Sequence, residues 1–224
     1  MTKLAIIHTT AATVDSLKAL SAEVLPDREL INFVDDSILP QLARNGANLA
    51  DVEERLIQYA RFAEQVGADI ILEACSSVGE LVPKMQAVVS IPIVRIDEAM
   101  AEEAVQRGTH VGVAATLQTT LQPTTRLLQR KAQEIGKQVD VEPVLIEGAY
   151  QKLMAGDRDG HDNLLVEKLS ELALVTDVVV LAQASMARVL PRLSTHDQDK
   201  ILVSPPRAMA QIKSMIDSHT RTDS

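Results

Sequence analysis

The sequence is poor in aromatic residues and holds a single cysteine. Only 2% of its 224 residues are Phe, Trp or Tyr, and Trp is absent. The core must therefore be built from Val, Ile, Leu, Ala and Met, a composition common where helices bury both faces of a parallel sheet. One cysteine cannot form an internal disulfide, which predicts a reducing, cytoplasmic location.

Long apolar runs and basic clusters are missing as well. No segment approaches ~20 uninterrupted apolar residues, so no transmembrane helix is expected, and the first residues, MTKLAIIHTT, indicate a strand rather than a signal peptide. The net charge of −9 without a Lys/Arg cluster excludes a nucleic-acid partner. No glycine-rich phosphate loop, dinucleotide fingerprint or metal-loop spacing occurs, so we expect no cofactor and no metal.

Short β-branched runs alternate with amphipathic helical patterns. The expected strands are 3–8, 28–33, 69–73, 93–95, 110–114, 140–145, 177–181 and 200–203. The clearest helical periodicity covers 50–66, 122–135 and 163–175. Alternation of this kind predicts an α/β fold with parallel strands.

One pattern occurs twice along the chain. Cys75 lies 66 positions after Thr9, and Gln183 lies 67 positions after Thr116. Each later residue ends an apolar run that begins with Asp six positions earlier, in DIILEAC and DVVVLAQ. This spacing indicates an internal duplication of a half of roughly 100 residues.

The duplication predicts two similar lobes, related by a pseudo-two-fold axis, each with a short parallel sheet flanked by helices. We expect the first lobe to comprise 1–97 plus 206–224 and the second to comprise 98–205. Ligands of open parallel sheets bind beyond the carboxyl ends of the strands. Because the four repeated residues stand at such ends, we expect one ligand cleft between the lobes.

Four segments resemble motifs of the aspartate/glutamate/hydantoin racemase superfamily. IILEACSS, residues 70–77, resembles its first cysteine motif, and VGVAATLQT, residues 111–119, resembles the opening of its second lobe. VLAQASMA, residues 180–187, resembles the second cysteine motif in its hydantoin-racemase form. FVDDSILP, residues 33–40, resembles the loop after the second strand.

The resemblance implies a cofactor-independent enzyme in which two cysteines act on opposite faces of a carbon next to a carboxylate. It implies that Cys75 is an acid/base whose pKa is lowered by the N-terminus of a following helix. Hydroxyls and backbone N–H groups would stabilise the charge that develops on the carboxylate. The substrate-binding residues that we expect are Thr9, Thr10, Ser76, Ser77, Thr116, Thr119, Gln183 and Ser185.

The sequence departs from the family pattern at Gln183, which stands where the second cysteine belongs. A neutral amide neither accepts nor gives a proton usefully, so a symmetric two-thiol enzyme is not expected. His8 and Asp35, on strand-end loops, are candidates for a second acid/base. Glu73 receives no role, although a carboxylate near a thiol raises the thiol pKa.

Three functions stay open for a chain with one thiol. The first is an isomerase of the racemase/epimerase type that acts on a small carboxylic acid and forms a dimer, as the family often does. The second is a single-thiol decarboxylase or lyase of the arylmalonate decarboxylase type, or an enzyme that adds the thiol to a double bond, as in the maleate isomerase branch. The third is a non-catalytic protein that binds small acids.

Overall fold

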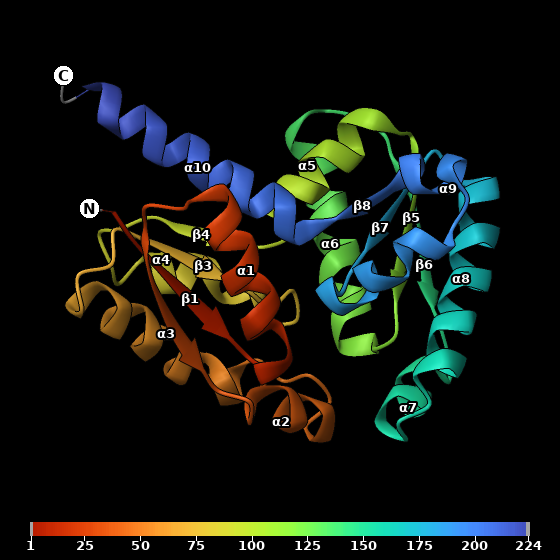
Figure 1. Ribbon diagram of the computed structural model, residues 1–224, viewed down its shortest axis with the longest axis horizontal. Coiled ribbons are helices and arrows are strands. Elements are labelled where there is room, and N and C mark those ends of the chain that lie inside the picture. Colours follow the sequence, from red (N-terminus) through yellow and green to blue (C-terminus); the bar gives the residue numbers. More distant parts are fainter. Residues whose placement is uncertain (1, 223–224) are drawn as a thin grey trace. The chain divides into compact units, whose positions relative to one another are not determined.

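The computed structural model describes residues 2–222 and divides the chain into two compact units. Unit 1 comprises Met1–Asp97 and Pro205–Ser224, and unit 2 comprises Glu98–Ser204. In Figure 1 each unit contains a sheet flanked by helices. Within residues 2–222, no helix combines the length and the apolar character that crossing a membrane requires.

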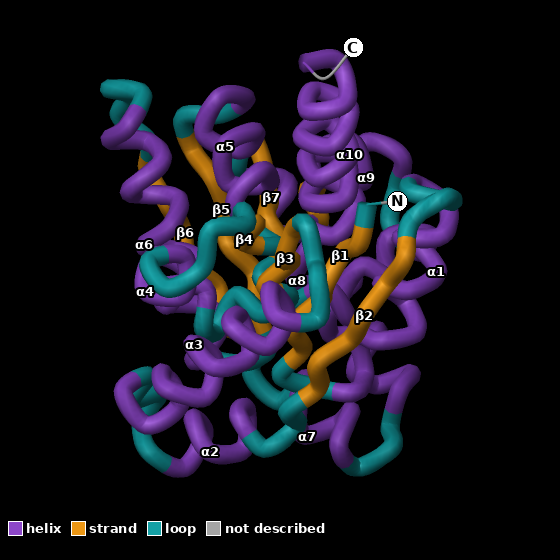
Figure 2. The backbone as a smooth tube through the Cα atoms, turned by 90° about the vertical axis from the view of Figure 1, so that its left-hand side faces the viewer, coloured by secondary structure: helices purple, strands orange, loops and turns teal. Residues whose placement is uncertain are grey.

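Unit 1 contains a parallel sheet of four strands in the order β2-β1-β3-β4, which can be followed in Figure 2. The strands are β1 (Lys3–His8), β2 (Glu29–Val34), β3 (Ile70–Glu73) and β4 (Ile93–Arg95). Ile7 of β1 lies opposite Glu73, the last residue of β3. The carboxylate of Asp69 accepts the backbone N–H of Lys3 at 2.7 Å and so fixes the start of both central strands.

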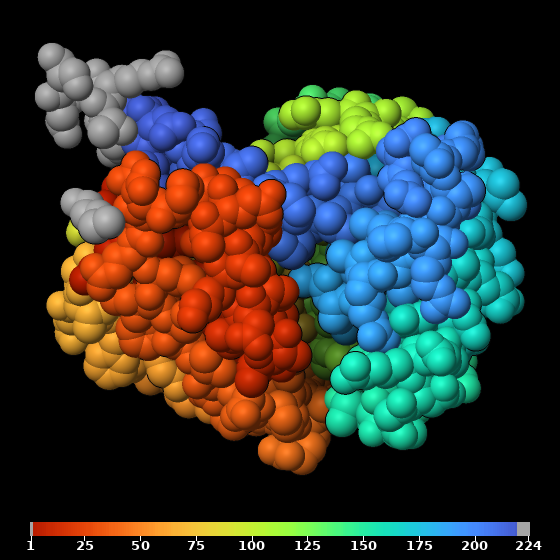
Figure 3. Space-filling view, in the orientation of Figure 1, coloured from red at the N-terminus to blue at the C-terminus, as the bar shows by residue number. Residues whose placement is uncertain are grey.

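Helices cover both faces of this sheet. On one face lie α1 (Val14–Val24) and α10 (Ser204–Thr222). On the other face lie α2 (Ile38–Arg44), α3 (Ala50–Gln65) and α4 (Val82–Gln86). Two short 3₁₀ helices, η1 (Ala11–Thr13) and η2 (Gly79–Leu81), precede α1 and α4. Side chains alternate along a strand, so Ile6 packs toward α1 and α10 and Ile7 toward α2, α3 and α4. The red surface of the α1 segment is visible in Figure 3.

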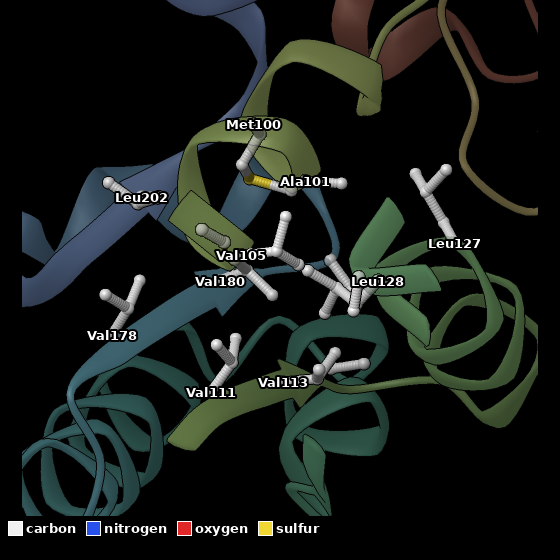
Figure 4. Close-up of a cluster of buried hydrophobic side chains, with 14 of the residues drawn as sticks. Met100, Ala101, Val105, Val111, Val113, Leu127, Leu128, Val178, Val180 and Leu202 are labelled. Atoms are coloured by element: carbon white, nitrogen blue, oxygen red, sulfur yellow. The ribbon is translucent and has the colours of Figure 1, made fainter. Parts of the chain in front are cut away.

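Unit 2 repeats this sheet in the order β6-β5-β7-β8, with β5 (His110–Ala115), β6 (Asp140–Leu145), β7 (Val178–Leu181) and β8 (Ile201–Val203). One face of this sheet carries α5 (Glu98–Arg107) and α6 (Gln118–Glu134). The other face carries α7 (Ala149–Met154), α8 (Arg158–Val175) and the 3₁₀ helix η3 (Ala184–Arg192). The short helix α9 (Thr195–Lys200) precedes β8. Figure 4 shows strand valines such as Val180 packed beneath Met100 of α5.

The two sheets make equivalent backbone hydrogen bonds at the carboxyl ends of their central strands. The backbone N–H of Ala74 donates to Ile7 in unit 1 at 3.0 Å, and that of Ala182 donates to Ala114 in unit 2 at 2.9 Å. Cys75 and Gln183 therefore follow equivalent ladder bonds. The predicted α/β fold, with two similar parallel sheets flanked by helices, is confirmed.

Two local predictions were wrong. The residues after Cys75 form a turn, η2 and the five-residue α4, rather than a helix that begins beside the thiol. For the segment 157–162 the sequence predicts a solvated loop that caps the following helix, but most of it belongs to α8, which begins at Arg158. Asp157 caps that helix by accepting the backbone N–H of Gly160 at 2.8 Å, because Asp at this position satisfies a donor that the first turn leaves free.

Candidate functional site

Cys75, the only thiol of the chain, lies two residues beyond the end of β3. Its side chain is half-buried and packs against the core under α2, α3 and α4. Thr9, from the end of β1, and Ser77, from the following turn, place hydrogen-bonding groups at the sulfur. The end of the β1–β3 pair thus surrounds one thiol with hydroxyls.

The thiol is far from being a thiolate at neutral pH. Burial, followed by the charge of Glu73, raises the pKa of Cys75 from 9.0 to about 12. Hydrogen bonds from Thr9 and Ser77 oppose this rise only in part. The direction is opposite to the one expected from a helix N-terminus, because α4 is short and burial dominates.

The neighbouring hydroxyls differ in how they are engaged. Apart from its interaction with the Cys75 sulfur, the buried Thr9 Oγ1 has no hydrogen-bond partner among the described protein atoms, so it is available to a thiolate or a ligand. Thr10 Oγ1 accepts the backbone N–H of Ala12 at 3.3 Å and caps η1. Ser76 and Ser77 are buried in the turn after Cys75.

His8 makes hydrogen bonds through both ring nitrogens. Nδ1 lies 3.0 Å from Thr13 Oγ1 and Nε2 lies 2.9 Å from Asn32 Oδ1. Burial lowers the pKa of His8, against the raising effect of the Asn32 hydrogen bond, so the ring is held neutral. By strand alternation its side chain leaves β1 on the face of Ile6, away from the face on which Cys75 packs.

Asp35 is the acceptor of a polar network after β2. Its carboxylate receives hydrogen bonds from the Ser37 hydroxyl at 2.5 Å, the Tyr59 hydroxyl at 3.0 Å and Arg55 Nη1 at 2.8 Å. Burial alone would raise the pKa of Asp35, but the bonds from Ser37 and Tyr59 and the charge of Arg55 lower it overall. These contacts tie the β2–α2 loop to α3 and make the carboxylate a weak base.

In unit 2, Gln183 binds to Thr116. Gln183 Oε1 accepts both the backbone N–H of Thr116 at 2.6 Å and its hydroxyl at 2.9 Å. Because a backbone N–H can only donate, this contact fixes the amide orientation and leaves Nε2 as the outward donor. Thr119 is half-buried in the first turn of α6, and Ser185 is exposed in η3.

Sequence reasoning named Glu73 without assigning it a role, and it missed the buried group of charges to which Glu73 belongs. Glu73 Oε1 accepts the backbone N–H of Cys75 at 2.8 Å. The neighbouring strand contributes Arg95, whose Nε and Nη2 bind the two oxygens of Asp97 at 2.5 and 3.0 Å. The available signal was a charged residue in each of two strands that are otherwise apolar. Among the described residues, no cluster of three or more His, Cys, Asp and Glu side chains is arranged to hold a metal.

The sheet order, the repeated register and the strand-end thiol define a class of two-sheet α/β proteins. The family described as Asp/Glu/Hydantoin racemase matches residues 4–212, and the chain belongs to this family. The resemblance inferred from the sequence motifs is thus confirmed.

Solved structures share the fold at low sequence identity. Glutamate racemase from Francisella tularensis, in complex with D-glutamate, gives a TM-score of 0.76 at 16% identity and covers 98% of this chain and 82% of that chain. Allantoin racemase from Klebsiella pneumoniae gives a TM-score of 0.66 at 17% identity, and the match covers 98% of this chain and 89% of that chain. Arylmalonate decarboxylase gives a TM-score of 0.56 at 15% identity, and the match covers 94% of this chain and 92% of that chain. The search of curated protein sequences gave no significant match.

Proposed function

We propose that this protein is a cofactor-independent isomerase of the racemase/epimerase type, with Cys75 as acid/base at the carbon next to the carboxylate of a small acid. The observation that carries the proposal is the position of the chain's only thiol, at a strand end between Thr9 and Ser77, in a member of this family. Solved relatives that act on glutamate and allantoin support a small polar acid or a related compound as substrate.

The hydroxyls and amides at the strand ends are the proposed substrate-binding groups. Thr9 Oγ1 and the Ser76–Ser77 turn would bind a carboxylate beside the thiol in unit 1. In unit 2, the oriented Nε2 of Gln183 would donate to a carboxylate or carbonyl oxygen, with Thr116 holding the amide in place. Donors aimed at the developing negative charge lower the barrier to removing a weakly acidic proton.

The high thiol pKa has two opposite effects on this chemistry. A thiolate with a pKa near 12 is a strong base, which suits a weakly acidic carbon. The same pKa leaves only about one thiolate in 10⁵ thiols at pH 7, so ionisation must accompany substrate binding.

A second candidate function is a single-thiol decarboxylase or lyase. A neutral thiol is ready to give a proton, and protonation of an enediolate after loss of carbon dioxide requires no second base. The neutral state of Cys75 and the amide at Gln183 both favour this reaction. The shared fold of arylmalonate decarboxylase is compatible with it.

Deuterated water separates these functions. A panel of amino acids, hydroxy acids, hydantoins and malonates is incubated with the protein, and the α-proton signal is followed by NMR. Exchange with inversion supports the isomerase, whereas loss of carbon dioxide supports the decarboxylase. Cys75→Ala should abolish either reaction, and Ser16→Ala, at an exposed position of α1, serves as the matched control. If no acid reacts and Cys75→Ala binds ligands as the wild type does, the protein is a non-catalytic binder.

A cytoplasmic homodimer belongs to the same proposal. The cytoplasmic location is supported by the single cysteine, which cannot form an internal disulfide, and the dimer by the resemblance to a family whose members often form dimers. Analytical ultracentrifugation over a range of concentrations tests the dimer, and a monomer at all concentrations contradicts it.

A further inference from the structure

Three charged side chains are buried on the sheet face where Cys75 packs. Glu73 and Asp97 are 0% exposed and Arg95 is 5% exposed. Glu73 lies opposite Arg95 across the β3–β4 pair, and strand alternation places both on the face of Ile71 and Ile93. The group therefore lies directly behind the strand end that presents the thiol.

Unit 2 shows that the fold itself does not need these charges. In the equivalent register, Leu181 of β7 lies opposite Val203 of β8, where unit 1 pairs Glu73 with Arg95. Burying charges is costly, and well-packed apolar residues in their place are often as stable or more stable. The charged group occurs only in the unit that carries the thiol, which points to a role in the chemistry of that thiol.

The backbone is adapted to this group. A Cβ atom at Gly79 would overlap the guanidinium of Arg95, so glycine at this position makes room for it. By the same sequence offset that relates Cys75 to Gln183, the residue equivalent to Gly79 in unit 2 is Ala187, and Val203 stands at the position equivalent to Arg95. The glycine and the arginine thus form one feature that unit 2 lacks.

Glu73 is the member of the group whose charge is compensated least. Arg95 binds both oxygens of Asp97, and its charge offsets that of Glu73 only in part. Glu73 Oε1 accepts the Cys75 N–H, but Oε2 is buried without a hydrogen-bond partner among the described protein atoms. Burial and then the charge of Asp97 raise the pKa of Glu73 well above its usual value, against the opposing effects of Arg95 and the Cys75 N–H. A proton on Oε2 removes this charge.

We propose that Glu73 is a positioning residue that shares one negative charge with Cys75, so that either the carboxyl group or the thiol is ionised, but not both. This inference rests on the proposed acid/base function of Cys75. With Glu73 protonated, the pair can lose the thiol proton, and the new charge lies on sulfur. With Glu73 ionised, its charge holds the proton on sulfur, so Cys75 stays a neutral thiol and releases its proton only as Glu73 takes one up.

The charge state of Glu73 decides whether Cys75 can act as a base in the proposed reaction. When a substrate binds and excludes water while Glu73 is neutral, Cys75 is able to act as a base. Ionisation of Glu73 prevents the thiol from acting as a base, and the thiol can then give its proton to a carbanion or enediolate only as Glu73 takes up another, so that one charge stays on the pair. Glu73 would thus select between proton removal and proton donation without touching the substrate.

The test is the pH dependence of alkylation of Cys75 by iodoacetamide in the wild type and in Glu73→Gln. The glutamine keeps an oxygen for the Cys75 N–H but cannot ionise. We expect equal rates at low pH, where Glu73 is neutral in the wild type. As pH rises the variant should react progressively faster, with a lower thiol inflection, by about three- to fourfold for each unit by which the thiol pKa falls, because lower nucleophilicity offsets part of the tenfold gain in thiolate. Glu53→Gln, which removes a surface carboxylate paired with Lys84, is the matched control and should follow the wild type.

A rate ratio that does not change with pH would overturn the proposal, since a purely structural role affects all pH values alike. If Glu73→Gln does not fold, the wild type decides through a ¹³C NMR titration of its carboxyl groups. A Glu73 signal that titrates well above pH 4.5 supports the pair, and one that titrates near pH 4.5 refutes it. Neither measurement uses a substrate. The inference can therefore hold even if no acid exchanges deuterium, and it can fail while exchange is observed.

Discussion

Cys75 should react unusually slowly with disulfide reagents at neutral pH, and the structure sets the size of the effect. The rise in thiol pKa from 9.0 to about 12 makes the thiolate about a thousandfold scarcer. A more basic thiolate is also more nucleophilic, with a Brønsted coefficient of about 0.4–0.5, which returns a factor of roughly 16–32. The net prediction is a rate about 30–60 times lower than that of an ordinary cysteine.

The chain provides its own reference, because it contains no other thiol. The rate of reaction with an aromatic disulfide is followed by absorbance for the folded protein and for the same protein in urea. The two are compared from pH 6 to pH 11. The unfolded chain should level off near pH 9, while the folded protein should continue to gain about tenfold per pH unit beyond it.

The shape of the profile separates ionisation from access. If burial merely blocked the reagent, the folded protein would be slower by a constant factor and would level off at the same pH as the unfolded chain. An inflection at or below pH 9 would refute the raised pKa and, with it, the influence of Glu73 on the sulfur. A folded protein that reacts faster than the unfolded one would indicate an activated thiolate instead.

Three further predictions follow from the same structure. The raised pKa of Glu73 means that the folded state binds a proton that the unfolded chain releases near pH 4.5, so the wild type loses stability as pH rises from there to the folded pKa. In urea unfolding, the free energy of unfolding of Glu73→Gln relative to that of the wild type should therefore rise by about 1.4 kcal/mol per pH unit in that window. A difference between the two that does not change with pH contradicts this. Gln183→Cys places a thiol at the position equivalent to Cys75; NMR in deuterated water should then detect inversion at the α-carbon at a higher rate than in the wild type, and an unchanged or lower rate argues against a missing second acid/base. Gly79→Ala should displace the guanidinium of Arg95 and lower the free energy of unfolding by about 3–5 kcal/mol, the usual cost of breaking a buried ion pair; a loss below ~1 kcal/mol would show that the arginine moves aside freely.

The strands were predictable because each is a short apolar run bounded by polar residues. β1 and β4 match their predicted bounds, and β7 begins one residue late because Asp177 turns its carboxylate to the N–H groups of Thr109 and His110. Several helices were harder. In α5, two of the four buried residues are Ala101 and Ala104, so close packing by small side chains replaces the apolar stripe that a sequence pattern detects.

The site was only partly predictable, for a physical reason. The equivalence of Cys75 and Gln183 follows from spacing, because the repeated parallel register conserves the distance along the chain between strand ends. The partnership of Glu73 with Arg95 depends on which strands become neighbours and on how deeply they are buried, and neither is written in local spacing. The direction of the thiol pKa was missed for the same reason, since burial decided it.

The path of the chain between the two units has a consequence for biosynthesis. The helix after β4, α5, packs in unit 2, whereas the helix after β8, α10, packs in unit 1, where Met209 and Ile212 complete one side of the core. Unit 2 is a continuous segment and can acquire its whole core as soon as it leaves the ribosome. Unit 1 begins first but must keep an apolar sheet face open until the last helix is made. We therefore expect the half that carries the thiol to complete its core after unit 2 during synthesis.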